Sequence, residues 1–205
     1  MAGVDPARVA ANLAEVREEV GPGVRVLTAV KYVDIDGLGA LVAGGVDVAG
    51  ENRAQALVDK HAAFPDLEWH FIGQLQSRKV KTVLPLVTWI HSVASDSALE
   101  QLGRHGTPET EVLVEVNVAR EEGKGGVDPD ALDAFLERCP VTVVGLMTMP
   151  PAAPAPEDSR RWFSALRELA HARGLRELSM GTTQDYAVAA QEGATIVRVG
   201  SRVFR

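Results

Sequence analysis

Lys31 carries the side chain in this sequence that is best placed to form a covalent bond with a ligand. Seven mainly apolar residues, VRVLTAV at 24–30, come directly before it. At the end of a buried strand we expect its ammonium to be partly desolvated, which lowers the pKa of an amine and makes it a better nucleophile toward carbonyls. Such a lysine suits a Schiff base. A strand-end lysine that extends its ammonium into solvent would fit the same pattern.

Two glycine-containing segments late in the chain have the composition of a phosphate-binding site. SMGTT at 179–183 precedes a helix expected from about residue 184, and VRVGS at 197–201 adds a second glycine and hydroxyl. Backbone N–H groups at a helix N-terminus bind anions without a lysine, although a plain helix cap and glycine turn look the same. Together with Lys31, these segments favour two kinds of site. One binds pyridoxal 5'-phosphate (PLP), and the other belongs to a Schiff-base aldolase for a phosphorylated sugar.

Arg198 helps to choose between these two sites. It stands between Val197 and Val199 in an apolar run, so its side chain points opposite to theirs along a strand. If the valines pack against helices, the guanidinium points inward, where it cannot lose its proton. Beneath a PLP ring it would donate to the pyridine nitrogen and keep that nitrogen unprotonated. The alternative is an inner arginine paired with a carboxylate such as Glu115.

These residues need a scaffold, and apolar runs that alternate with helical periodicity provide one. We expect strands at 24–30, 46–50, 68–73, 87–93, 111–118, 141–149, 177–180 and 195–200. We expect helices at 5–20, 34–44, 53–63, 76–84, 96–104, 129–138, 157–173 and 184–192. Alternation of this kind is typical of parallel βαβ units.

The number of units predicts the architecture. Eight βα units in 205 residues indicate an α/β fold, a compact (β/α)₈ TIM barrel, with residues 1–205 as a single domain. An open doubly wound sheet is the alternative, but it would need an edge strand polar enough to face water. In a barrel the site lies at the C-terminal ends of the strands. Lys31, SMGTT and VRVGS all fall there.

Composition and charge argue against several classes of protein. The net charge of -7 is unlike that of a general nucleic-acid-binding surface. We see neither a signal peptide nor a run long enough to cross a membrane. The single cysteine, Cys139, and the five unclustered histidines predict no metal site. We expect a cytoplasmic protein without membrane or nucleic-acid partners, and a monomer because no helix shows an unpartnered stripe.

Several segments together carry a resemblance to a known family. They are LTAVKY (27–32), GENRAQ (50–55), EWHFIGQLQSRK (68–79), VNVAREEGKGG (116–126), GLMTMP (145–150) and LSMGTTQDYAVAAQEGATIVRVGSRVF (178–204). They cover nearly the whole chain, and HFIG-x-LQS with SMG-x-x-x-D is a specific combination. The chain resembles the YggS/PROSC family of PLP-binding proteins, also called PLP homeostasis proteins. That family is similar to the barrel domain of alanine racemase, the fold type III class of PLP proteins.

The resemblance implies a role for each candidate residue. Lys31 would hold PLP as an internal aldimine, and Arg198 would face the pyridine nitrogen. Thr183, Gly200 and Ser201 would form the phosphate cradle, the last two through their backbone amides. The residues implied to line the ring pocket or its wall are Asn52, His70, Met147, Ser179, Met180 and Thr182.

The sequence departs from the family's usual pattern at three places. Members usually read SMGMS where this chain reads SMGTT, so Thr182 replaces a methionine and Thr183 keeps the hydroxyl of a serine. Arg78 replaces an asparagine in LQSRK. Members usually continue past IFG, whereas this sequence ends at VFR, so we expect the segment near the phosphate to be altered.

The first functional hypothesis is a carrier that buffers PLP, or delivers it to apo PLP-dependent enzymes, without robust turnover and without a catalytic residue. Related racemases need a second acid/base, typically a tyrosine from a C-terminal β domain. Tyr32 and Tyr186 are the two tyrosines here, and strand alternation predicts that Tyr32 points away from the face of Lys31. The alternatives are a racemase-like PLP enzyme that uses Lys31 as base, and an aldolase without PLP.

Overall fold

The strands form a closed parallel barrel. The computed structural model describes residues 4–204, and within them eight strands pair in chain order. They are β1 Arg25–Ala29, β2 Val48–Glu51, β3 Glu68–Phe71, β4 Trp89–Val93, β5 Glu111–Glu115, β6 Thr142–Met147, β7 Glu177–Thr182 and β8 Ile196–Val199. β1 closes the barrel by pairing with β8, from Arg25 opposite Ile196 to Thr28 opposite Val199. The predicted (β/α)₈ barrel is confirmed.

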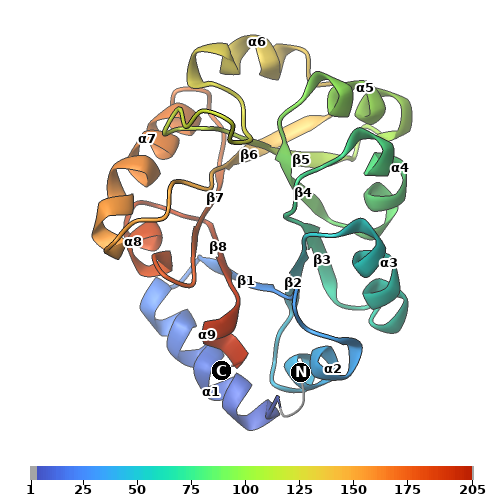
Figure 1. Ribbon diagram of the computed structural model, residues 1–205, viewed down its shortest axis with the longest axis vertical. Helices are drawn as coiled ribbons and strands as arrows, with labels where there is room; N and C mark the ends of the chain where they lie inside the picture. The colour runs from blue at the N-terminus through green and yellow to red at the C-terminus, as the bar shows by residue number, and fades with distance from the viewer. Residues whose placement is uncertain (1–3, 205) are drawn as a thin grey trace.

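The helices surround the barrel on its outside (Figure 1). The α-helices are α1 Pro6–Val20, α2 Ile35–Ala43, α3 Ala54–Ala63, α4 Val80–Val83, α5 Asp96–His105, α6 Leu132–Glu137, α7 Arg160–His171, α8 Tyr186–Gln191 and α9 Ser201–Phe204. Short 3₁₀ segments are η1 Ser77–Lys79, η2 Leu84–Leu86, η3 Pro129–Ala131 and η4 Pro156–Ser159. None of the helices in this part of the chain combines the length and apolar character that a membrane span needs.

Several elements differ from the sequence-based expectation. The helix predicted at 76–84 is divided into η1, α4 and η2, and Pro85 stands at the start of η2, where its missing N–H is tolerated. β5 ends at Glu115 rather than at residue 118, whereas β7 continues to Thr182. α9 is too short to leave a periodic pattern in the sequence.

Side chains on the strands alternate between the barrel interior and the surrounding helices. The outward-facing residues join one large hydrophobic core with the helices, and Phe163 and Leu166 of α7 are completely buried in it. Inside the barrel, a smaller apolar cluster contains Leu27, Val48 and Ile196. Much of the remaining interior is polar, which is unusual for a barrel filled by branched apolar residues.

A buried ion pair holds the two turns that follow β1 and β2. The Lys60 ammonium contacts the Glu51 carboxylate, and both residues are buried. Lys60 Nζ also donates to the carbonyl oxygen of Val30 at 2.6 Å. The other carboxylate oxygen of Glu51 accepts from the backbone N–H groups of Asn52 and Arg53. One pair therefore ties together the backbone before Lys31 and the backbone after β2.

We expect Lys60→Met to destabilise the protein by about 3–5 kcal/mol, because it leaves the Glu51 carboxylate buried without its cation. The double variant Lys60→Met/Glu51→Gln should recover much of this loss, since the amide is neutral and still accepts from the two backbone N–H groups. Chemical denaturation with matched slopes measures both free energies of unfolding.

Arg17→Met is the matched control for this prediction. Arg17 pairs with Asp47 on the surface, where both side chains are substantially exposed, and exposed pairs contribute roughly 0–1 kcal/mol. If Lys60→Met costs no more than Arg17→Met, the buried pair does not have the structural role described here.

Candidate functional site

A cleft of about 800 Å³ opens at the C-terminal ends of the strands. Its walls include residues at or just beyond the ends of β1, β2, β3, β5, β6, β7 and β8. Of the eleven residues predicted for the cofactor site, eight line this cleft: Lys31, Asn52, Met147, Thr182, Thr183, Arg198, Gly200 and Ser201. The fold therefore brings most of the predicted set to one place, as expected for the active face of a barrel.

The other three predicted residues lie elsewhere. Met180 is fully buried in the core between barrel and helices, because alternation along β7 turns it outward while Ser179 faces inward. Ser179 and His70 are buried in the barrel interior, where each is hydrogen-bonded to His91. These three residues therefore do not line the cleft, and their contact with a cofactor stays a prediction.

The surroundings of Lys31 also differ from expectation. β1 ends at Ala29, and Lys31 and Tyr32 form a turn in which both are exposed. Lys31 Nζ lies 4.6 Å from the centroid of the Tyr32 ring, and both residues line the cleft. The predictions of a partly desolvated ammonium and of an averted Tyr32 are wrong, because strand alternation ends before residue 31.

The backbone of this turn is held from outside. Arg53 donates to the carbonyl oxygen of Lys31 at 3.0 Å, next to the bond from Lys60 to Val30. Two cationic side chains therefore fix consecutive carbonyl groups, while the Lys31 side chain stays free to reach into the cleft.

The loops after β7 and β8 meet through one hydroxyl. The backbone N–H of Gly200 donates to Thr183 Oγ1 at 3.0 Å. A hydroxyl that accepts one hydrogen bond keeps its own proton available, so Thr183 can donate to a ligand. The amide of Gly200, expected to contact a phosphate directly, instead orients this threonine.

Asp185 shapes the loop that carries Thr182 and Thr183. Its carboxylate accepts from the backbone N–H of Thr182 at 2.7 Å and lies 3.2 Å from the Thr182 hydroxyl. α8 starts after Asp185 rather than at residue 184. Gly181 has a φ of 87°, and a Cβ there would lie 2.5 Å from that of Ala189, so only glycine fits. Asp185 is the last residue of the SMG-x-x-x-D motif, so the motif was the feature of the sequence that could have identified it as a site residue.

Arg198 points into the barrel, as the sequence predicted. Val197 and Val199 are buried in the outer core, and the guanidinium reaches the cleft. Its Nη1 donates to Ser179 Oγ at 2.6 Å and its Nη2 to the carbonyl oxygen of Thr148 at 2.8 Å. Burial lowers the pKa of the guanidinium to about 10, so the group remains protonated at neutral pH.

Glu115 shares the cleft with Arg198 without being its hydrogen-bond partner. Burial raises the pKa of the Glu115 carboxyl, and the positive charge of Arg198 opposes that rise. Arg198 directs its N–H groups at Ser179 and Thr148 instead. The alternative hypothesis placed Arg198 in a pair with Glu115. The two side chains interact only through a longer-range electrostatic attraction.

Asn52 contributes an unsatisfied polar atom to the cleft wall. Its Oδ1 is buried and has no hydrogen-bond partner among residues 4–204. Most buried polar atoms are paired, and an amide can present either its oxygen or its NH₂ to one side. An unpaired amide oxygen at this position fits a cleft that receives a polar ligand.

Several lining residues were not among the predicted set. They include Tyr32, Gln74, Glu115, Lys124 and Phe204. Gln74 and Lys124 follow predicted strands, so strand-end position was the available signal for them. Phe204 comes from the short helix α9, which sequence periodicity did not reveal.

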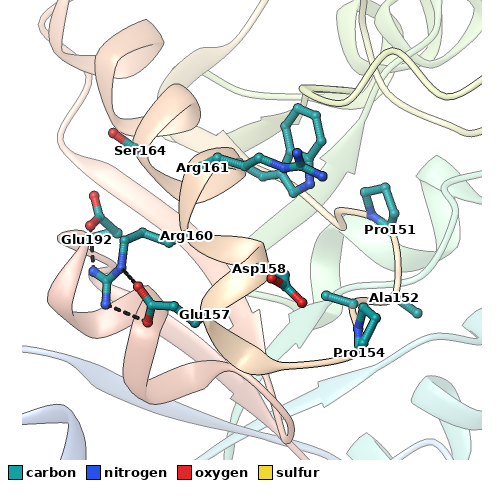
Figure 2. Close-up of a pocket in the computed structure, with 11 residues that line it drawn as sticks. Pro151, Ala152, Pro154, Glu157, Asp158, Arg160, Arg161, Ser164 and Glu192 are labelled. Carbon is teal, nitrogen blue, oxygen red and sulfur yellow. Dashed lines mark hydrogen bonds and ion pairs between the residues drawn. The ribbon is translucent and has the colours of Figure 1, made fainter.

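A second groove, of about 710 Å³, lies outside the barrel between α7 and the proline-rich loop PPAAPAP at 150–156 (Figure 2). Figure 2 shows that the Arg160 guanidinium is directed at Glu157 and Glu192. The guanidinium of Arg161 lies 4.5 Å from the ring centroid of Trp162. These cations already have partners, and the groove shares no lining residue with the cleft that contains Lys31.

Comparison with known proteins identifies the family to which this chain belongs. The family model of the alanine racemase N-terminal domain matches residues 4–205. A pyridoxal phosphate homeostasis protein of Aquifex aeolicus is 40% identical over 215 aligned residues, which cover 96% of this chain and 94% of that protein.

Solved structures agree with this match. PipY of Synechococcus elongatus without PLP superposes with a TM-score of 0.86 at 32% identity, covering 96% of this chain and 100% of PipY. PipY with PLP bound gives a TM-score of 0.83 at 30% identity, with the same coverage. The chain therefore belongs to the alanine racemase N-terminal domain family and, within it, groups with the pyridoxal phosphate homeostasis proteins.

Proposed function

We propose that this chain binds PLP in the cleft at the strand ends and serves in PLP homeostasis. The observation that carries this proposal is the meeting of Lys31, Thr183 and Arg198 in one cleft. A relative named as a pyridoxal phosphate homeostasis protein and the PLP-bound structure of PipY support it.

The residues of the cleft fit this cofactor. Arg198 is a permanent donor and would face the ring nitrogen, which it keeps unprotonated. The free hydroxyl proton of Thr183 suits a phosphate oxygen, and the unpaired Oδ1 of Asn52 suits a polar substituent of the ring. When bound, PLP supplies an aldehyde that reacts with primary amines and a ring that withdraws electrons.

Lys31 would attach the cofactor covalently through its amine. Its side chain is exposed in a wide cleft, with the Tyr32 ring beside it. An accessible attachment point favours uptake and release over a sealed reaction chamber. We therefore assign no catalytic residue and propose a carrier without robust turnover. Apo PLP-dependent enzymes would be the acceptors, in a cytoplasm that keeps the thiol of Cys139 reduced.

The contact between Lys31 and Tyr32 favours a second candidate function, a racemase-like PLP enzyme with Lys31 as base. Tyr32 was expected to point away, and this counted against a second acid/base group. Exchange of the α-proton of alanine or serine for deuterium, measured by NMR with Tyr32→Phe alongside, tests this candidate. Failure across a panel of amino acids would exclude it.

We expect the protein saturated with PLP to show a yellow absorbance band that disappears on borohydride reduction and leaves the cofactor covalently bound. Lys31→Ala should show neither the band nor the covalent adduct, because Lys31, rather than Lys124 in the same cleft, is the proposed attachment point. Absorbance spectra and intact mass, before and after reduction, measure both properties.

Lys81→Ala is the control for this prediction, because Lys81 is exposed on α4 and does not line the cleft. An adduct that persists unchanged in Lys31→Ala would contradict the assignment of Lys31. No binding by the unmodified chain would contradict the proposed function itself.

Replacing the Thr183 hydroxyl should weaken PLP binding. We expect Thr183→Val to raise the apparent Kd about tenfold or more, since a hydrogen bond to a charged group contributes about 1.5–3 kcal/mol. Thr183→Ser keeps the hydroxyl and should stay within about threefold of the unmodified chain. Fluorescence titration with PLP measures the three constants, and equal loss in both variants would argue against a hydrogen bond to phosphate.

Delivery of PLP distinguishes a carrier from a mere binder. We expect the loaded protein to reactivate an apo PLP-dependent enzyme faster than an equal concentration of free PLP in the presence of alkaline phosphatase. The phosphatase destroys free PLP, whereas PLP passed directly from the cleft is protected. Recovery of enzyme activity over time is the measurement. Reactivation no faster than with free PLP would count against delivery.

A further inference from the structure

A chain of polar side chains crosses the barrel interior beneath the cleft. It runs through Glu68 and His70 on β3, His91 on β4, Ser179 on β7 and Arg198 on β8. His70, His91 and Ser179 are completely buried, whereas the Glu68 side chain is one-third exposed. The chain therefore joins opposite walls of the barrel and connects a partly exposed carboxylate to the base of the cleft.

Each link has the length of a good hydrogen bond. Arg198 Nη1 lies 2.6 Å from Ser179 Oγ, and Ser179 Oγ lies 2.8 Å from His91 Nδ1. His91 Nε2 lies 2.8 Å from His70 Nδ1, and His70 Nε2 lies 2.8 Å from Glu68 Oε1. A buried polar network is stable only when all its members are paired, and here every link is made.

The two ends of the chain determine the direction of every bond. A carboxylate only accepts, so His70 donates from Nε2 to Glu68. In a neutral ring, His70 Nδ1 then accepts from His91 Nε2, and a neutral His91 accepts from Ser179 at Nδ1. The single hydroxyl proton of Ser179 is thereby committed, and its lone pairs face Arg198, which can only donate. No donor in the chain meets another donor.

The protonation of these groups agrees with that direction. Burial lowers the pKa of both histidines, and His91 is affected more strongly. The hydrogen bond from His70 is the largest of the effects that lower the pKa of Glu68, and Arg25 also donates to this carboxylate at 3.0 Å. At neutral pH both rings are therefore neutral and Glu68 is ionised.

We propose that Glu68, His70, His91 and Ser179 are positioning residues that hold the Arg198 guanidinium in a fixed orientation toward the ring nitrogen of the cofactor. This inference rests on the proposed function, because it concerns the use of Arg198 in that site. Without Ser179 as a committed acceptor, Nη2 would still donate to Thr148, but Nη1 would lose its partner and could be drawn toward the Glu115 carboxylate in the same cleft.

The first test needs no cofactor. Long-range ¹H–¹⁵N correlation spectra of the imidazole rings should show His70 and His91 as neutral Nε2–H tautomers at pH 7. In Glu68→Gln the amide can donate as well as accept, so we expect the Nδ1–H tautomer to become populated. Nδ1–H tautomers for both rings in the unmodified chain would overturn the proposed direction.

The second test compares PLP with 1-deaza-PLP, which has carbon in place of the ring nitrogen. We expect the unmodified chain to bind PLP about tenfold more tightly, the value of one hydrogen bond from a charged donor. In Ser179→Ala this ratio should fall to about one, and in Glu68→Gln by roughly threefold. A merely structural role would weaken both ligands equally and leave the ratio unchanged.

Glu111→Gln is the matched control for Glu68→Gln. Glu111 also begins a strand, but it accepts from Trp89 and stands outside the chain. Its replacement should leave the ratio of the two affinities unchanged. A high ratio that persists in both Ser179→Ala and Glu68→Gln would overturn the positioning role and leave the proposed function intact. Failure of the unmodified chain to bind either ligand would instead contradict the proposed function.

Discussion

The parallel pairing of β1 with β8 is the contact on which the site depends. It joins the first strand to the last, and it places the turn containing Lys31 beside the loop containing Gly200. Such a contact closes nearly the whole chain into a loop, which is entropically costly and slow to form. A hydrogen bond from Asn12 in α1 to the carbonyl oxygen of Val203 in α9 adds to the closure. In Figure 1 these two helices lie side by side.

Buried charge occurs on both sides of the barrel wall, and each charge has several partners. Outside, the Lys60 ammonium is shared between Glu51 and a backbone carbonyl. Inside, Arg198 is held by a hydroxyl and a backbone carbonyl. Apolar residues of the same size would often be as stable at such positions. The charged residues Lys60 and Arg198 instead hold the neighbouring turn and the hydrogen-bond donor in one defined position. A ligand-binding cleft requires such fixed positions.

Much of the fold and most of the candidate site were predictable because they follow from local patterns. Short β-branched runs marked the strands, and the strand-end rule marked Lys31 and Thr183. The remaining features of the site could not be predicted from the alternation of side chains along a strand. Tyr32 lies beyond the end of β1, so its direction is set by a turn. Met180 and Ser179 are neighbours in a matching motif but face opposite sides of β7. The contact of His91 with Ser179 joins strands that are not paired with each other.

In the turn after β1, the bonds that fix the backbone do not involve the reactive side chain. Its backbone is held through the carbonyl groups of Val30 and Lys31, by Lys60 and Arg53. No bond in this arrangement uses the amine of Lys31. The side chain at position 31 can therefore be replaced while the backbone of the surrounding turn keeps its conformation. A sequence that lost this lysine would retain the architecture of a binding cleft, and reactivity could be lost or regained there without rebuilding the fold.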